Sequence, residues 1–239
     1  MLYTLIPMVL AIGPALFVVW YYYQQDKQKP EPKGLIVKVF LLGIVVTFPV
    51  IIVELIVGKF ERIFTNIPLL YYLFQAFVVA ALCEEAFKLW IVRKFVYYNI
   101  NFDEVMDGVV YTVVASLGFA CMENILYVLD GGLSTALLRA FTAIPMHALA
   151  SGTMGYYIGK AKFAANKSEE KSLIYKGLWW AIFIHGLYDF LIFVIPVFGL
   201  ISGLGIFPLL IVVFIKLRGK IKLALKEDSE SGRTAEYNQ

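Results

Sequence analysis

Long apolar runs separated by short charged loops are the feature that most constrains this chain. Seven runs are long enough to cross a hydrocarbon core of roughly 30 Å at about 1.5 Å per helical residue. They cover residues 3–23, 35–57, 68–92, 108–129, 135–158, 173–195 and 197–217. With 60% hydrophobic and 16% charged residues, a water-soluble fold of 239 residues could not hide so much apolar surface. We therefore expect an all-α polytopic membrane helical bundle of about seven transmembrane helices.

Basic residues predict the orientation of this bundle. Seventeen of the 21 lysines and arginines lie in one set of loops and the tail, and the opposite set holds only Lys59 and Arg62. Because such residues are retained on the cytoplasmic side, we place the N-terminus outside and the C-terminus inside. The net charge of +3 thus follows the membrane and indicates no nucleic-acid partner. We assign residues 1–225 to the helical domain and 226–239 to a polar tail expected to be disordered.

Apart from the lysines counted with the loops, nine acidic, basic or histidine side chains lie inside the apolar runs, and they include the only two histidines. They are Glu54, Glu84, Glu85, Lys88, Glu123, Arg139, His147, His185 and Asp189. A charge facing lipid costs about 2.5 to 3.5 kcal/mol on insertion scales, so these groups must face one another. We expect them to line a polar intramembrane cavity. Glu54 is the exception, because it lies near the outer end of its run and can reach the interface.

The spacing of these residues places several of them on shared helix faces. Glu84 and Lys88 are four residues apart, as are His185 and Asp189, and Asn124 follows Glu123 directly. Arg139 precedes His147 by two turns in the predicted fifth helix, where Ser151, Gly155 and Gly159 form a packing face. The nine side chains include five acids and only two bases besides the histidines. The excess negative charge requires protons, imidazolium groups or a bound cation, a condition typical of acid–base catalysis or proton coupling.

Four ordered motifs on successive helices resemble the PrsW family of intramembrane proteases, relatives of the CAAX prenyl endopeptidases and of bacteriocin-processing membrane enzymes. The motifs are Glu84-Glu85-x-x-Lys88, Gly118-Phe119-x-x-x-Glu123-Asn124, Arg139 with His147, and His185-x-x-x-Asp189. The resemblance implies peptide-bond hydrolysis within or beside the bilayer of a bacterial cell membrane. It further implies site-1 cleavage of a single-pass anti-sigma factor in stress signalling.

The chain departs from the prenyl endopeptidase pattern at three positions. Lys88 stands at a shorter spacing where those relatives have arginine, Glu123 where they have histidine, and Asp189 where they have asparagine. The mechanism of those relatives therefore cannot be copied residue by residue. In particular, an ionised Asp189 can only accept hydrogen bonds and is unsuited to hold an oxyanion.

We interpret Glu84, with Glu85 beside it, as the general base that activates a trapped water. Glu123 would share the proton or hold the water, and a protonated His147 or His185 would stabilise the oxyanion. Four further residues have supporting roles: Lys88, Arg139, Asn124 and Asp189. The two basic residues among them offset the acid charge.

A zinc-dependent alternative uses much the same residues. His147 and His185 with Glu123 or Asp189 would hold the ion and leave Glu84 as base. Because no HExxH helix is present, this site depends on convergence of separate helices, and we favour the metal-free reading.

Two other classes of protein also place ionisable groups in a membrane. A proton- or cation-coupled transporter or channel would do so, but the chain is small and lacks paired inverted halves. A non-catalytic scaffold would use the same groups for assembly only.

Overall fold

The computed structural model describes residues 2–27 and 29–234, and every regular element in them is helical. The elements are α1 (Leu2–Gln25), α2 (Lys33–Gly58), the 3₁₀ helix η1 (Lys59–Phe64), α3 (Pro68–Phe74), the π-helix η2 (Gln75–Leu82), α4 (Cys83–Phe95), α5 (Val105–Phe141), α6 (Ala143–Lys162), α7 (Lys167–Phe193), α8 (Ile195–Phe198), α9 (Leu200–Leu204) and α10 (Ile206–Glu230).

The predicted all-α polytopic architecture is confirmed. Within the described residues, five helical stretches are long and apolar enough to cross a membrane. One of them, Val105–Lys162, contains both α5 and α6, and α7 adds a further helix of 27 residues. Taken separately, the long segments of the described chain therefore number seven: α1, α2, the continuous α3–η2–α4 segment, α5, α6, α7 and α10.

The helices that cover the predicted fourth and fifth runs do not begin and end where we expected. α5 runs to Phe141 through a bend at Gly132, whose φ of 63° favours glycine. α6 begins only after Thr142, and Pro145 lies in its first turn, where a missing N–H breaks no helical hydrogen bond. The prediction that Arg139 and His147 share one helix is therefore wrong.

The C-terminal helix is longer than predicted. α10 continues to Glu230 and so takes in the first part of the segment 226–239 that was expected to be disordered. Its order has a physical cause, because the buried carboxylate of Asp228 accepts hydrogen bonds from the backbone N–H groups of Val105 and Met106 at 2.8 and 3.0 Å. Residues 235–239 of the predicted tail lie outside the described residues.

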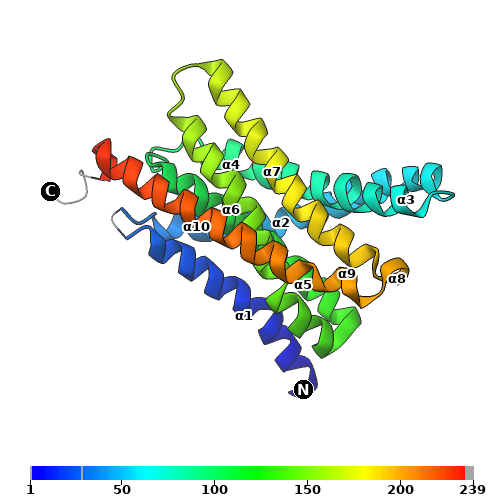
Figure 1. Ribbon diagram of the computed structural model, residues 1–239. Coiled ribbons are helices and arrows are strands. Elements are labelled where there is room, and N and C mark those ends of the chain that lie inside the picture. Colours follow the sequence, from blue (N-terminus) through cyan, green and yellow to red (C-terminus); the bar gives the residue numbers. More distant parts are fainter. Residues whose placement is uncertain (1, 28, 235–239) are drawn as a thin grey trace.

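Loops rich in basic residues gather at one end of the bundle. Ion pairs link separate segments there: Lys29 and Asp103 pair between two loops at 2.8 Å, and Lys160 of α6 pairs with Glu227 of α10 at 2.6 Å. α3, α8 and α9 lie on the opposite side of the molecule from the C-terminal end of α10 (Figure 1). The two ends of the bundle thus differ in charge, as the sequence predicts.

α5 forms the centre of the bundle, and nearly every residue from Val105 to Cys121 is buried. It packs against α1, α2 and α6. The approach of α6 depends on missing side chains, because a Cβ on Gly155 would collide with the carbonyl oxygen of Gly108. The face predicted from Gly155 and Gly159 is thus a packing face against the start of α5.

We expect Gly155→Ala to lower the free energy of unfolding by about 1 to 3 kcal/mol, because the added methyl group must push α5 and α6 apart. Reversible unfolding in mixed detergent micelles measures this loss. Gly13→Ala is the matched control, since a Cβ there meets nothing within 4 Å. Equal stability of the two variants would contradict close packing at Gly155.

Candidate active site

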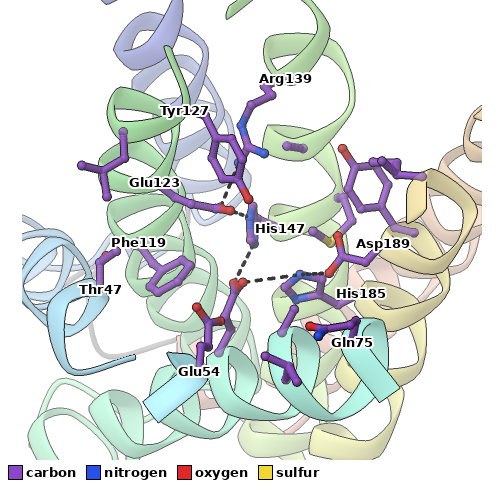
Figure 2. Close-up of a pocket in the computed structure, with 18 of the residues that line it drawn as sticks. Thr47, Glu54, Gln75, Phe119, Glu123, Tyr127, Arg139, His147, His185 and Asp189 are labelled. Atoms are coloured by element: carbon purple, nitrogen blue, oxygen red, sulfur yellow. Dashed lines mark hydrogen bonds and ion pairs between the residues drawn. The ribbon is translucent and has the colours of Figure 1, made fainter. Parts of the chain in front are cut away.

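A cavity of about 310 Å³ opens among α2, η2, α4, α5, α6 and α7 (Figure 2). Its walls are largely apolar, but several ionisable side chains line it from separate helices. They are Glu54, Glu84, Glu123, Arg139, His147, His185 and Asp189. The cavity therefore collects acids and imidazoles from five helices into one chamber.

The backbone that presents Glu84 and Glu85 is unusual. The π-helix η2 ends at Leu82, immediately before the first turn of α4, which carries both glutamates. Single π turns are frequent at functional sites, and here the π segment extends over eight residues. Gln75, its first residue, also lines the cavity. Hydrophobic patterning cannot distinguish such a segment from an ordinary apolar helix.

The ammonium of Lys88 lies at the centre of the buried charges. Its Nζ is 3.0 Å from Glu84 Oε2, 2.8 Å from Glu85 Oε1 and 3.1 Å from His147 Nδ1. It also lies 4.5 Å from the centroid of the Phe119 ring. Because an ammonium can only donate, the Nδ1 atom of His147 accepts here, and its Nε2 atom carries the proton.

Glu84 and Glu85 have different surroundings. Glu85 is completely buried and makes three contacts: with Lys88, with His185 Nδ1 at 2.9 Å and with the Ser151 hydroxyl at 2.9 Å. It does not line the cavity, whereas Glu84 does. Glu84 is thus the member of the pair that can reach a molecule in the cavity.

His185 lies among three carboxylates. Its Nδ1 atom faces Glu85, and its Nε2 atom is 3.2 Å from Asp189 Oδ2 and 3.9 Å from Glu84 Oε1. The rings of His147 and His185 meet edge to face, with centroids 5.1 Å apart. Asp189 therefore acts on His185 as an acceptor, which is the role that its carboxylate permits.

A second buried ion pair closes the other side of the cavity. Arg139 Nη2 lies 2.9 Å from Glu123 Oε2, and the same oxygen is 2.9 Å from His147 Nε2. Asn124 holds the guanidinium by accepting from Arg139 Nε at 2.7 Å, and Tyr127 stacks beneath it at 4.0 Å. The bend at Gly132 makes this pairing possible by returning Arg139 towards the first part of α5.

All nine residues predicted for the site come together around this cavity. The five residues predicted as catalytic are Glu84, Glu85, Glu123, His147 and His185, and the four predicted as supporting are Lys88, Asn124, Arg139 and Asp189. Asn124 is buried behind Arg139 and does not line the cavity. The catalytic roles themselves stay predictions.

The position predicted for Glu54 is wrong. Its side chain lines the same cavity as Glu84 and Glu123 instead of reaching the interface, and Figure 2 shows it among the lining residues. α2 ends at Gly58, one residue beyond the predicted run, so the error concerns the direction of the Glu54 side chain, which turns towards the cavity. Sequence reasoning also missed Tyr127 and the contact of Ser151 with Glu85, since neither a tyrosine nor a small-residue face signals a site.

The residues present fit a zinc ion by donor type. Glu84, Glu85, His147 and His185, all buried, each offer one ligand atom within 4.8 Å of the others. This set shares the two histidines with the predicted one, but it contains Glu84 and Glu85 in place of Glu123 and Asp189. Lys88 competes for the position, because its ammonium already contacts three of these four residues.

The fold and the cavity define a class of protein: polytopic membrane enzymes whose acid–base groups are buried within a helical bundle. Residues 31–217 match the family described as "PrsW family intramembrane metalloprotease". The relative named "Protease PrsW" from Geobacillus kaustophilus is 37% identical over 193 residues, which cover 81% of this chain and 82% of the relative. Its namesake from Bacillus subtilis is 35% identical, over 76% and 80% of the two chains.

A third "Protease PrsW", from Oceanobacillus iheyensis, is 34% identical over 92% of this chain and 94% of its own. No solved structure matches the chain. The chain belongs to the PrsW family of intramembrane proteases.

We expect Lys88→Met to lower the free energy of unfolding by about 3 to 5 kcal/mol, because it leaves Glu84 and Glu85 buried without a cation. Lys94→Met, which removes an exposed ammonium from the end of the same helix, should change stability little. The double variant Lys88→Met/Glu85→Gln should recover part of the loss. Unfolding midpoints of Lys88→Met and Lys94→Met that coincide would contradict a stabilising role for Lys88.

Proposed function

We propose that this protein hydrolyses a peptide bond of a membrane-anchored substrate with a water molecule that Glu84 activates. One observation carries the proposal: Glu84 alone both contacts the Lys88 ammonium and lines the cavity, among the carboxylates of the described residues. Its Oε2 atom is held by Lys88, so Oε1 is available to a water near His185.

The reaction needs only groups that face the cavity. The water oxygen attacks the scissile carbonyl carbon, and Glu84 takes the proton that the water loses. The tetrahedral intermediate then breaks its C–N bond, and Glu84 returns the proton to the departing amine nitrogen. No net proton is gained or lost by the protein.

Charge on the tetrahedral oxygen is stabilised by the cationic and N–H groups of the cavity wall. Glu85 holds His185 at Nδ1, and the Nε2–H group, whose hydrogen bond Asp189 accepts at 3.2 Å, would be shared with the tetrahedral oxygen. Glu85 is then a positioning residue. Glu123 and His147 form the second pair that can hold the water, while Arg139 offsets the charge of Glu123.

A zinc-dependent form of the same reaction is the second candidate, favoured by the donor set and by the family description. Glu84, Glu85, His147 and His185 would hold the ion. Bound zinc would polarise the carbonyl and lower the pKa of a bound water. The position of Lys88 among three of these donors favours the form without a resident metal.

The substrate class is a single-pass membrane protein, and an anti-sigma factor is the candidate within it. The cavity lies among the half of the bundle that includes Gln75 and Phe193, remote from the basic loops. With the basic loops in the cytoplasm, the N-terminus lies outside and water enters from the outer side. This orientation supports an initial, site-1-type cleavage outside the cytoplasm of a bacterial cell, in line with the bacterial origin of the relatives.

We expect Glu84→Gln to lower the rate of cleavage by at least 10²- to 10⁴-fold, because the amide cannot accept a proton from water. Mass spectrometry of products from a reconstituted single-pass anti-sigma factor measures the rate. Glu169→Gln, an exposed acid at the start of α7, is the control and should cleave normally. Unchanged cleavage by folded Glu84→Gln would refute the assignment. Proton or solute flux through vesicles without any cleavage would instead favour a transporter.

Removal of zinc should leave cleavage unchanged, because Lys88 already provides the cation among the donor atoms. The measurement is the cleavage rate after treatment with a zinc-selective chelator in buffer that retains Mg²⁺, together with the metal content of the purified protein. Loss of activity that added zinc restores, while the protein stays folded, would establish the zinc-dependent form.

A further inference from the structure

A second cluster of buried acids lies at the basic end of the bundle, away from the cavity. Asp26 follows the end of α1, Glu104 caps the N-terminus of α5, and Asp107 lies in the first turn of α5. Each is only 1% exposed. One carboxylate oxygen from each of the three lies within 4.8 Å of the others. These acids converge from two segments that are far apart in the sequence.

Four oxygens of this cluster have no hydrogen-bond partner among the described residues. They are both oxygens of Asp26, Oε1 of Glu104 and Oδ1 of Asp107. The other oxygens are occupied: Asp107 Oδ2 accepts from the backbone N–H groups of residues 103 and 104 at 2.7 Å each, and Glu104 completes the capping box. A buried carboxylate without partners is costly, so the four open oxygens require a ligand.

The basic groups nearby are engaged elsewhere. Lys29 pairs with Asp103 at 2.8 Å, and Arg233 pairs with Asp228 at 2.8 Å. Glu31, a buried acid beside the cluster, accepts a hydrogen bond from the Tyr111 hydroxyl. In the described residues, no ion pair reaches Asp26, Glu104 or Asp107.

Protons alone satisfy this cluster poorly. Burial, followed by the charge of Asp107, raises the pKa of Asp26 to about 8, so protonation removes part of the charge. A protonated carboxyl nevertheless still needs an acceptor for its O–H group, and neither oxygen of Asp26 has a neighbour at hydrogen-bond distance. A cation would satisfy both the charge and the open lone pairs.

We propose that Asp26, Glu104 and Asp107 form a binding site for a hard divalent cation, Mg²⁺ or Ca²⁺, that ties the end of α1 to the start of α5. Both ions bind carboxylate oxygens at about 2.0 to 2.6 Å, so ligand oxygens around one ion lie within roughly 5 Å of one another. The absence of histidine and cysteine from the three-residue set disfavours zinc and copper. The cation holds together the same end of α5 to which Asp228 of α10 binds.

Titration of the purified full-length protein with Mg²⁺, Ca²⁺ and Mn²⁺ tests this site after prior removal of metal by a chelator. Metal content after equilibrium dialysis measures uptake, and tryptophan fluorescence follows thermal unfolding. We expect saturable uptake of one ion per chain by the wild type. At a hundred times Kd, Tm should rise by roughly 5 to 10 °C.

Asp26→Asn and Glu104→Gln should each lose this uptake and the rise in Tm. Glu230→Gln is the matched control, because it removes an exposed acid from the same end of the bundle and should retain both. Equal uptake by all variants would mean that the ions bind elsewhere and would overturn the proposal. A wild-type Tm that none of the three cations changes would also overturn the proposal, and this result does not depend on the folding of any variant. Loss of uptake with cleavage intact would separate this site from the active site.

Discussion

The buried ammonium of Lys88 is the interaction on which the rest of the site depends. Two adjacent glutamates inside a membrane bundle repel each other, and neither can be hydrated as it would be in water. Lys88 contacts both carboxylates and the Nδ1 atom of His147, so one positive charge fixes three groups on two helices. That arrangement decides which glutamate is free, because Glu85 is fully occupied while Glu84 keeps one side towards the cavity. A second cation, Arg139, organises Glu123 in the same way.

Close backbone packing makes this arrangement geometrically possible. α5 carries Glu123 and Asn124, and it is approached by α2 and α6 at glycines where a Cβ would strike backbone atoms. At Gly118 the obstacle is the carbonyl of Phe40, and at Gly155 it is the carbonyl of Gly108. Larger residues would move the surrounding helices outward and lengthen hydrogen bonds that are now about 3 Å long. The small residues therefore contribute to the chemistry indirectly, by setting the distance between His147 on α6 and Glu123 on α5.

Sequence patterns were sufficient for the fold class and for predicting that most of the buried ionisable residues converge, but not for the geometry of the cavity. Runs of apolar residues predict helices, and the cost of charge in lipid predicts that Glu84, Lys88 and His185 meet. The break predicted between residues 129 and 135 coincides with the bend at Gly132, but the break at Thr142 was missed, and this error placed Arg139 and His147 on one helix. The π-helix before Glu84 leaves no pattern, since its residues are apolar in either register. The position of Glu54 was missed because hydropathy predicts where α2 ends but not which way a side chain near its end turns.

The two acidic clusters differ in how their charge is neutralised. In the cavity, the acids have Lys88, Arg139 and two imidazoles, so water or a peptide can occupy the remaining space without a further cation. At the other end of α5, Asp26, Glu104 and Asp107 are as deeply buried but no lysine or arginine pairs with them in the described chain. The helix N-terminus of α5 offers only a partial positive charge, about half an elementary charge, which cannot balance three carboxylates. The same electrostatic requirement that explains Lys88 therefore leaves a cation to be supplied from solution at the basic end of the bundle.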